Sequence, residues 1–477
     1  MKEHRSNSYS EKEMKRISSM AKTYNVVTFG CQMNERDSET LVGMLEDMGY
    51  VYEENFKEAD VCILNTCSVR ENADKHFFGV LGQLKNPHEQ NPGRITCVCG
   101  CMMQQQHIID TLKSKYSWVD LVFGTHNIQN FPELFKNVRD EKVKLVEVWS
   151  DAEAIAEGLP AKRSYDFKAY VSIMQGCNNF CTYCIVPYTR GRERSRRPEE
   201  ILEEVRCLVN SGCKEITLLG QNVNSYGIAR SVPGTYHYDK EKGEINDDGS
   251  LNLDFAGLIR AIDKIEGIER IRFMTSHPKD ISDELIDCFR DCKHLCHMIH
   301  LPVQSGSDVV LKKMNRHYDR QWYFDKIDKL RAVCPDIAIS TDIIVGFPGE
   351  TEENFEDTLD LVKKVRYDSA FTFIYSVRKD TPAEKYEDQI PEDVKHERFN
   401  RLLAVIHEIQ EEKSKQYQDK ILKVLVEGPS KTNESVLTGR TDSNMTVDFT
   451  GNAELIGKIV DVKIVKAQTF SLYGEIV

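Results

Sequence analysis

The chain has 477 residues, of which 40% are hydrophobic and 29% charged, and its formal net charge is −13. This length allows a full hydrophobic core and predicts two or three domains. The acidic balance argues against bulk attraction to nucleic acid, so any RNA binding would need a local basic surface. No apolar stretch reaches membrane-spanning length, which argues against a membrane protein and favours a cytoplasmic one.

Two features of the composition narrow the class of protein further. Residues 1–22 are polar and charged and lack the apolar core of a signal peptide, so we expect a disordered tail. The chain contains 15 cysteines, which in a long cytoplasmic protein indicate metal-binding or catalytic thiolates rather than disulfides. The odd number of cysteines further weakens a complete pairing scheme.

The first predicted domain covers residues 23–140 and alternates short β-branched runs with amphipathic stretches. Strands are expected at residues 26–29, 61–64 and 95–99, each followed by a helical pattern, and Asn34 can cap the first helix. Strands that alternate with helices predict an α/β domain built on a parallel sheet.

Each of these strands ends at a small or turn-forming residue that precedes a cysteine. The three cysteines are Cys31, Cys67 and Cys101. Ligands of open α/β sheets bind outside the carboxyl ends of the strands, so we predict that these thiolates form one three-cysteine site. The two cysteines within the third strand are set aside because Gly100 is expected to end that strand. The alternative is three ordinary buried cysteines, since free cysteine is among the most buried residue types.

After a predicted linker at residues 141–164, a second domain at residues 165–413 contains six further strand patterns separated by helical ones. This alternation predicts a partial (β/α)6 barrel, whose chemistry is expected at the carboxyl ends of the strands. Residues 229–250 are rich in glycine and charged residues and are expected to form an excursion loop. The strands are expected at residues 169–174, 215–219, 270–274, 298–301, 337–341 and 371–375. Polar residues at the expected strand ends are Gln221, Asn222, Ser276, His277, Gln304, Ser305, Ser307 and Asp342.

The first strand of the second domain leads into a C-x3-C-x2-C loop formed by Cys177, Cys181 and Cys184. Clusters used only for electron transfer are usually held by four cysteines, so three thiolates in one loop indicate an iron-sulfur cube with one iron left open. A zinc site is the alternative for a cysteine-rich loop, but no fourth cysteine or histidine lies nearby.

A dense basic run follows this loop and consists of Arg190, Arg192, Arg194, Arg196 and Arg197. Guanidinium groups bind planar or tetrahedral anions in a bidentate manner, so this run could hold a cofactor carboxylate or RNA phosphates. The alternative is a solvated loop paired to Glu193 and Glu199.

Cys288, Cys292 and Cys296 recur every four residues, which resembles a metal site, although the helix is expected to end near Lys293. The remaining cysteines are expected to be packing residues. They are Cys62, Cys97, Cys99, Cys207, Cys213 and Cys334.

The last segment, residues 414–477, follows a long charged helix pattern at residues 392–415 and consists of short strands and turns, which predicts a small β-barrel. From residue 421 to the end we count six Lys plus Arg and seven Asp plus Glu. This near balance leaves a purely structural β-domain as open as an RNA-binding one.

These motifs resemble known families. The C-x3-C-x2-C loop resembles the cluster loop of radical S-adenosylmethionine (SAM) enzymes, in which three cysteines hold a 4Fe-4S cluster and the amino and carboxylate groups of SAM bind the fourth iron. The sequence GFPGET at residues 346–351 is similar to the glycine-proline motif that this family places near the adenine. A second cysteine triad ahead of such a barrel resembles the methylthiotransferases, and the last segment resembles the RNA-contacting TRAM module.

Three segments resemble the methylthiotransferases that act on N6-dimethylallyladenosine in tRNA. They are TFGCQMNERDSE at residues 28–39, the run at 177–196 that contains IVPYTRGRE, and HLPVQSGS at residues 300–307. The resemblance implies that Cys177, Cys181 and Cys184 hold the radical cluster, and that Cys31, Cys67 and Cys101 hold an auxiliary 4Fe-4S cluster. It also implies that two SAM molecules are used to place sulfur and a methyl group at C2 of the adenine at position 37. Candidates for orienting cofactor and base are Gln221, Asn222, Ser276, Gln304, Arg316, Asp342, Phe373 and Arg194.

The expected partners are a tRNA anticodon stem-loop, whose base must unstack to enter the site, and a flavodoxin-like or ferredoxin-like electron donor. The protein is expected to be a monomer. Two alternatives remain open. One is methylthiolation of N6-threonylcarbamoyladenosine, and the other is an iron-sulfur RNA-binding or sulfur-relay protein without radical chemistry.

Overall fold

The structure is a computed structural model that describes residues 22–68, 71–150, 155–228, 232, 234–430 and 433–477. The expected tail therefore lies outside the described residues except for Lys22, as do four residues of the expected excursion loop at 229–250. The chain forms two compact units. Unit 1 contains residues 1–152, 156–164 and 188–190, and unit 2 contains residues 153–155, 165–187 and 191–477.

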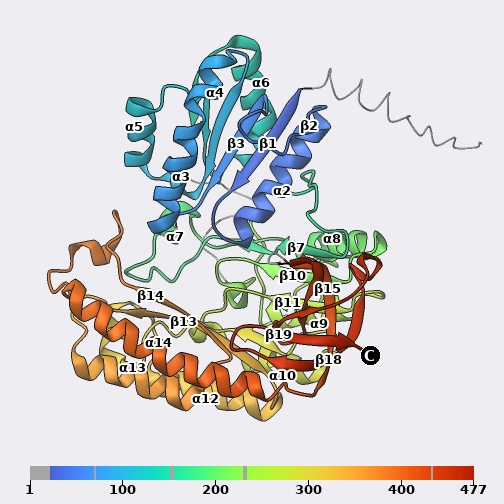
Figure 1. The fold of residues 1–477 in the computed structure, drawn as a ribbon, viewed down its shortest axis with the longest axis vertical. Helices are drawn as coiled ribbons and strands as arrows, with labels where there is room; N and C mark the ends of the chain where they lie inside the picture. Colours follow the sequence, from blue (N-terminus) through green and yellow to red (C-terminus); the bar gives the residue numbers. More distant parts are fainter. Residues whose placement is uncertain (1–21, 69–70, 151–154, 229–231, 233, 431–432) are drawn as a thin grey trace, which may run out of the picture. The chain divides into compact units, whose positions relative to one another are not determined.

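Unit 1 is built on a sheet of six parallel strands in the order β2-β1-β3-β4-β5-β6 (Figure 1). The sequence predicts only three of them, because the other three have two or three residues and are too short to show an alternating pattern. The strands are β1 (Thr23–Thr28), β2 (Val51–Tyr52), β3 (Val61–Thr66), β4 (Ile95–Gly100), β5 (Leu121–Phe123) and β6 (Leu145–Glu147).

Helices cover both faces of this sheet. On one face, α2 (Gln32–Asp47) and α6 (Phe131–Glu141) pack with Tyr24, Ile63 and Cys97. On the other face, α3 (Glu71–Gln83) and α5 (Gln106–Lys115) pack with Cys62, Leu64 and Val98. Neighbouring residues of one strand thus enter opposite cores, as expected of a parallel strand buried on both faces. A short helix, α4 (Lys85–Gln90), follows α3.

The structure corrects the expected start of α2. This helix begins at Gln32, and Cys31 occupies its N-cap position without a side-chain capping bond. Asn34 is buried in the first turn, and its side-chain amide donates to the carbonyl oxygen of Thr66 at 2.7 Å. Asn34 therefore does not cap the helix but ties it to the end of β3.

Unit 2 contains six parallel strands that form two three-stranded sheets, in the orders β11-β10-β7 and β12-β13-β14. An isolated parallel bridge between Ile271 and Leu295 lies between the two sheets. The prediction of a partial (β/α)6 barrel is confirmed. The strands are β7 (Lys168–Ser172), β10 (Glu215–Leu219), β11 (Arg270–Phe273), β12 (Met298–His300), β13 (Ala338–Val345) and β14 (Ser369–Ile374).

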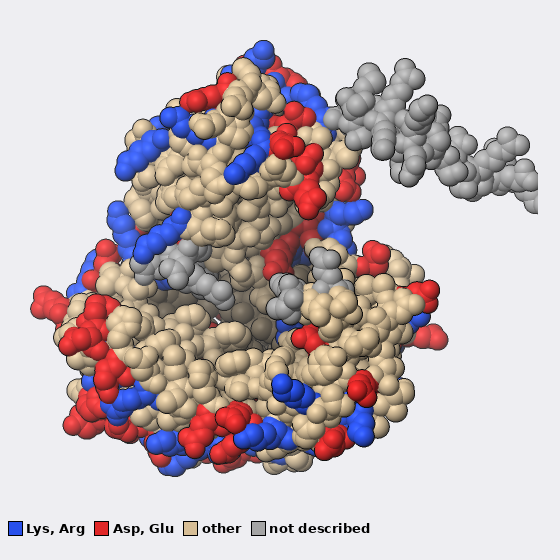
Figure 2. Space-filling model, in the orientation of Figure 1, with Lys and Arg blue, Asp and Glu red and all other residues tan. Residues whose placement is uncertain are grey.

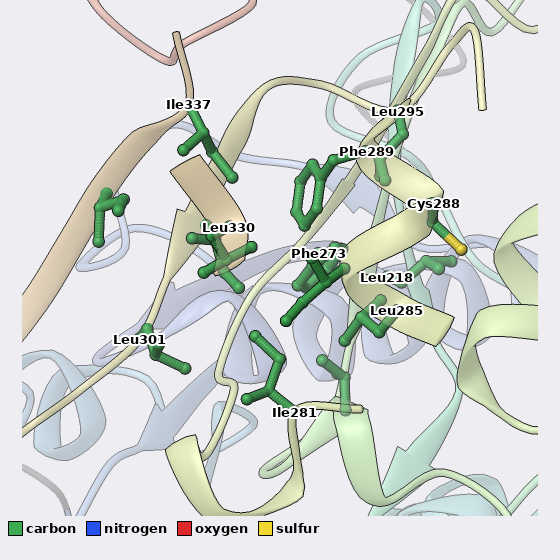
Figure 3. Close-up of a cluster of buried hydrophobic side chains, with 14 of the residues drawn as sticks. Leu218, Phe273, Ile281, Leu285, Cys288, Phe289, Leu295, Leu301, Leu330 and Ile337 are labelled. Atoms are coloured by element: carbon green, nitrogen blue, oxygen red, sulfur yellow. The ribbon is translucent and has the colours of Figure 1, made fainter. Parts of the chain in front are cut away.

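The helices that alternate with these strands bury one large core. Figure 3 shows part of it, where Phe273 and Leu218 of the strands meet Leu285, Cys288 and Phe289 of α10. The main helices are α8 (Pro198–Asn210), α9 (Phe255–Asp263), α10 (Asp283–Asp291), α12 (Arg320–Val333), α13 (Glu352–Val365) and α14 (Glu392–Lys415). Shorter elements of unit 2 are α11 (Asp308–Lys313) and the hairpin of β8 (Met174–Gln175) with β9 (Arg194–Ser195). The helix α7 (Val186–Thr189) begins in unit 2 and ends in unit 1. None of the described helices is long and apolar enough to cross a membrane.

The last strands of the chain close into a five-stranded barrel in the order β15-β16-β17-β19-β18, as the sequence predicts. Its centre is filled by Val424, Val426, Val447, Phe449 and Ile464. The strands are β15 (Ile421–Ser430), β16 (Asn433–Thr441), β17 (Thr446–Phe449), β18 (Ile459–Ala467) and β19 (Leu472–Ile476).

Buried charges fix this small barrel to the rest of unit 2. Arg272, on β11, donates to the carbonyl oxygens of Thr441 at 2.6 Å and Asp442 at 2.8 Å. Arg270 donates to two further carbonyl oxygens of the small barrel, and Glu215 pairs with both arginines. The two arginines are thus engaged by Glu215 and by carbonyl oxygens, so they attach the small barrel rather than form a free basic surface.

The outer surface of unit 2 carries charges of both signs. Along α12, α13 and α14, acidic and basic side chains alternate in the view of Figure 2. Many of them pair across helices, such as Arg320 with Asp357 at 3.3 Å and Arg398 with Glu352 at 3.1 Å. This surface therefore does not present the single-sign field expected of a wide phosphate-binding face.

Candidate functional site

In unit 1, the three predicted cysteine ligands lie at the carboxyl ends of neighbouring strands. Cys31 follows β1, Cys67 follows β3 and Cys101 follows β4. These strands pair directly, with Thr28 opposite Asn65 and Thr66 opposite Gly100, so the cysteines reach the same edge of the sheet. Cys67 and Cys101 are buried and Cys31 is half-buried.

Two glycines allow this close approach. Gly30 has φ +113°, and a Cβ atom at this position would lie 2.3 Å from the Cβ of Cys67. Gly100 has φ +95°, and its Cβ would lie 2.4 Å from the carbonyl oxygen of Thr66. At both positions a side chain would strain the backbone and clash with its neighbour, so glycine is required. The two Gly-Cys pairs therefore allow the thiols to come close together.

A buried arginine lies against this triad. Arg190 belongs to unit 1, and its Nε donates to the Sγ of Cys101 at 3.2 Å. Its Nη2 donates to Asp37 Oδ2 at 2.7 Å and to Asn34 Oδ1 at 3.3 Å. Because Arg190 is only 4% exposed, this ion pair stands in a low-dielectric surrounding. Sequence reasoning missed the pairing, although Asn34 and Asp37 lie in the segment that carries the family resemblance.

The charges around the triad favour thiolate at one position. The hydrogen bond with Cys67, assisted by the Arg190 guanidinium, lowers the pKa of the Cys31 thiol to about 6. Burial raises the pKa of Cys101, with Arg190 acting in the opposite direction. A positively charged group beside thiols is the arrangement expected of metal-binding cysteines.

In unit 2, Cys177, Cys181 and Cys184 lie on one loop after β8. Gly176 precedes the first of them with φ +82°, and a Cβ there would lie 2.0 Å from the carbonyl oxygen of Arg192. Arg316 Nη1 donates to Cys181 Sγ at 3.4 Å. Burial raises the pKa values of Cys177 and Cys184 to about 12.

The two triads fit iron-sulfur clusters better than single metal ions. Among the described residues, the three donors that all lie within 4.8 Å of one another are His297, Cys334 and Asp336. Neither cysteine triad is that compact. A single zinc ion draws its ligands to within about 2.3 Å of itself, whereas a cluster binds each thiolate on a separate iron and spaces them more widely.

Three buried polar atoms near the cluster loop have no hydrogen-bond partner among the described residues. They are Asn222 Oδ1, Ser276 Oγ and His277 Nε2. Asn222 follows β10, while Ser276 and His277 follow β11, so all three stand at carboxyl ends of barrel strands. Buried polar groups are almost always satisfied, so this set is suited to a polar ligand such as SAM. Burial also lowers the pKa of His277 well below its usual range, which keeps its imidazole neutral.

The other candidates for orienting cofactor and base occupy several positions. Gln221 accepts a hydrogen bond from the backbone N–H of Gly176, which fixes the start of the cluster loop. Gln304 has φ +72°, and its backbone N–H donates to the carbonyl oxygen of Asp342. Asp342 lies within β13 and not after it, because the strand continues to Val345. Phe373 is 37% exposed on β14.

The basic run is mostly internal. Arg194 is 1% exposed, with Nη2 donating to Gln175 Oε1 at 3.4 Å, and Arg196 pairs with Glu204 at 2.7 Å. Arg192 and Arg197 are exposed, and the Arg192 guanidinium lies 4.4 Å from the centre of the Phe180 ring. The alternative of a solvated loop is therefore wrong for Arg190, Arg194 and Arg196.

The remaining cysteines do not form a third triad. Cys288 and Cys292 belong to the large core, and Cys296 packs in a separate cluster with Met298 and Ala338. Cys207 is exposed on the solvent face of α8, so the expectation that it is a packing residue is wrong. Cys334 is buried, and its thiol donates to Asp336 Oδ1, which also contacts His297.

Family models match most of the chain. The model described as the radical SAM superfamily matches residues 171–362, the one described as uncharacterized protein family UPF0004 matches residues 23–124, and the TRAM domain matches residues 415–477. The three matches cover the two cysteine triads and the C-terminal barrel.

Curated relatives match over nearly the whole length. The chain is 54% identical to the tRNA-2-methylthio-N(6)-dimethylallyladenosine synthase of Clostridium perfringens strain SM101, over 96% of this chain and 98% of that protein. It is 54% identical to the protein of the same name from Alkaliphilus oremlandii, over 96% of this chain and 93% of that one. The Clostridium botulinum Alaska E43 protein of that name is 55% identical, over 95% of each chain.

A solved structure shares the fold at low sequence identity. The radical SAM methyltransferase TsrM from Kitasatospora setae, with cobalamin and a [4Fe-4S] cluster bound, superposes with a TM-score of 0.53. It is 13% identical and covers 76% of this chain and 77% of its own.

Proposed function

Because the chain belongs to the family of tRNA-2-methylthio-N(6)-dimethylallyladenosine synthases, we propose that it adds sulfur and a methyl group at C2 of N6-dimethylallyladenosine in tRNA. The observation that carries this proposal is the pair of incomplete cysteine triads, each with three thiols. A 4Fe-4S cluster held by three thiols would have one iron without a protein ligand. At one site this iron would activate SAM, and at the other it would deliver sulfur. A single triad would fit a radical enzyme with many other products.

The enzyme is a radical SAM tRNA methylthiotransferase, and its cofactors are SAM and 4Fe-4S clusters. When bound, these cofactors supply the radical that removes hydrogen from an aromatic carbon, which no side chain acting as a base could do. The residues of the chain hold and orient these cofactors. We assign Cys177, Cys181 and Cys184 to the radical cluster, and Cys31, Cys67 and Cys101 to the auxiliary cluster.

The polar residues near the radical-cluster loop have different roles. The unpartnered atoms of Asn222, Ser276 and His277 would bind polar groups of SAM, because they gain hydrogen bonds that the described residues do not offer. Arg316 holds Cys181 and the loop after β12 in place through two hydrogen bonds. Gln221 fixes the N–H of Gly176 at the start of the cluster loop.

The tRNA is the expected macromolecular partner, and a TRAM domain is present at residues 415–477. We propose that the anticodon stem-loop is the part that enters the barrel, because a base inside a stacked helix cannot reach the cluster. We further propose a monomeric cytoplasmic protein that receives electrons from a flavodoxin-like or ferredoxin-like donor.

We also propose a division of labour along the chain. Residues 23–140 would carry the auxiliary cluster, 141–164 would serve as a linker, 165–413 would form the radical SAM core, and 414–477 would contact RNA.

The test uses anaerobic, iron-loaded protein with dithionite, SAM and a synthetic anticodon stem-loop that carries N6-dimethylallyladenosine. We expect about eight irons per chain for two clusters, 5′-deoxyadenosine, and the 2-methylthio nucleoside by mass spectrometry. Cys101→Ser should lose the methylthio product while retaining 5′-deoxyadenosine, and Cys184→Ser should lose both.

Two results would contradict the proposal. A methylthio product found only on a stem-loop with N6-threonylcarbamoyladenosine would assign a different substrate. The absence of 5′-deoxyadenosine from fully iron-loaded protein would favour an iron-sulfur RNA-binding or sulfur-relay protein.

A further inference from the structure

Two large aromatic side chains are exposed on the inner face of the β12-β13-β14 sheet. Phe371 is 49% exposed and Phe373 is 37% exposed. The alternate residues of the neighbouring strands, among them Ile339 and Ile343, are buried in the core beneath the helices. The two phenylalanine rings therefore stand on the face turned away from the helices, inside the partial barrel.

Polar residues share this face. His300 Nδ1 lies 3.0 Å from Ser340 Oγ, and His300 Nε2 lies 3.5 Å from Asp342 Oδ1. The His300 and Phe371 rings meet edge to face, with centroids 5.9 Å apart. Phe371 is also the direct strand partner of Asp342, and Phe373 that of Ile344. We call His300, Ser340, Asp342, Phe371 and Phe373 the inner aromatic wall.

The charge on this wall is negative. The described residues of β12, β13 and β14 include no lysine or arginine. On the other sheet, the β11 arginines Arg270 and Arg272 are engaged by Glu215 and by carbonyl oxygens of the small barrel. The Asp342 side chain, 29% exposed, is thus the charged group that a ligand on this wall would meet.

The wall is connected to the radical-cluster loop. The strand β12 leads into the segment at Pro302, whose carbonyl oxygen accepts a hydrogen bond from Arg316 Nη2 at 2.8 Å. The same guanidinium donates to Cys181. A ligand that lies against the wall would therefore be positioned by elements that also position the cluster.

The chemistry of these side chains favours one kind of substituent. Aromatic rings stack on bases and pack against apolar groups. A dimethylallyl group is apolar and fits such a surface. A threonylcarbamoyl group carries a carboxylate, which would be repelled by Asp342 and would find no cation on the wall. Discrimination of this kind combines an attractive surface with a repulsive charge.

We propose that the inner aromatic wall selects an adenine whose N6 substituent is apolar and rejects one whose N6 substituent carries a carboxylate. Phe371 supplies the attractive surface and Asp342 the repulsive charge. This assignment rests on the proposed function and extends it to the residues that determine the substrate.

The experiment measures equilibrium binding of three anticodon stem-loops to iron-loaded protein without reductant. Their adenine is unmodified, dimethylallylated or threonylcarbamoylated. Phe371→Ala should reduce the preference for the dimethylallyl over the unmodified stem-loop about tenfold, since the ring packs against the apolar substituent that the unmodified adenine lacks. Asp342→Asn should improve binding of the threonylcarbamoyl stem-loop about tenfold and change the dimethylallyl affinity less than about twofold.

A matched control is Tyr52→Ala, which removes a 60% exposed aromatic ring from unit 1 and should leave both affinity ratios unchanged. Iron content and uncoupled 5′-deoxyadenosine formation show that each variant is folded. Unchanged ratios in both wall variants, or an equal loss on all three stem-loops, would overturn the proposal. Failure of the wild-type protein to methylthiolate the dimethylallyl stem-loop would instead contradict the proposed function, because the affinity ratios are measured without turnover.

Discussion

In unit 1, Cys31, Cys67 and Cys101 come from the ends of three paired strands, whereas in unit 2, Cys177, Cys181 and Cys184 come from one loop. The first triad exists only when the sheet has formed, since its members are 36 and 34 residues apart. The second can be assembled locally. A cluster site can therefore be specified either by the register of a sheet or by the spacing within a loop.

The surroundings of the two triads also differ. Around the first, Arg190 donates to Asp37, Asn34 and Cys101. Near the second, buried polar atoms such as Ser276 Oγ and Asn222 Oδ1 lack a hydrogen-bond partner in the part of the chain that the structure describes. Beside the first triad, the buried guanidinium is thus paired with protein groups. The second leaves room for a polar small molecule, and three predictions probe this difference.

The largest contrast is expected in thiol reactivity. At pH 7 a thiol with a pKa of about 6 is about nine-tenths thiolate, whereas one with a pKa of about 12 is ionised in about one molecule in 10⁵. In iron-free protein, Cys31 should therefore react with iodoacetamide near neutral pH, with the rate falling as pH drops through 6, while Cys177 stays unreactive. Peptide mass spectrometry across pH 5–9 measures both rates. Equal rates at the two cysteines would contradict the predicted difference in thiol pKa between the triads.

The next effect concerns the buried guanidinium. Arg190→Ala removes one partner of a buried pair and leaves Asp37 without its cation, which typically costs about 3–5 kcal/mol. We expect faster hydrogen exchange of the α2 and β4 amides and faster loss of iron from Cys101 and its partners. Lys85→Ala, which breaks an exposed pair with Glu89 in the same unit, serves as the control and should change neither. A protection pattern in Arg190→Ala equal to that of the wild type would show that the first triad does not depend on this pair.

Much of this arrangement could be predicted from the sequence. The Gly-Cys pairs at strand ends predict the first triad, and the C-x3-C-x2-C spacing indicates the second. The contact between Arg190 and Cys101 could not be predicted. The two residues are 89 positions apart, and no local sequence pattern indicates that they meet. The prediction that Asn34 caps the helix is wrong, because a tertiary hydrogen bond to Thr66 overrides its capping propensity. Strands of two or three residues, such as Val51–Tyr52, are too short to show the alternation of apolar and polar residues that identifies a strand.

The smallest effect is expected for the Ser276 hydroxyl, a buried group near the second triad. Ser276→Ala removes a buried hydroxyl that has no hydrogen bond, so the free energy of unfolding should change by less than about 1 kcal/mol. The KM for SAM should rise roughly three- to tenfold, because a hydrogen bond to the ligand is lost. Ser282→Ala is the matched control, since Ser282 caps α10 by accepting from the N–H of Leu285 and its loss should cost about 1 kcal/mol without affecting SAM. If Ser276→Ala destabilised the protein as much as Ser282→Ala and left the KM unchanged, the hydroxyl would be structural. The contrast between polar groups paired within the protein and polar groups that await a ligand would then not hold.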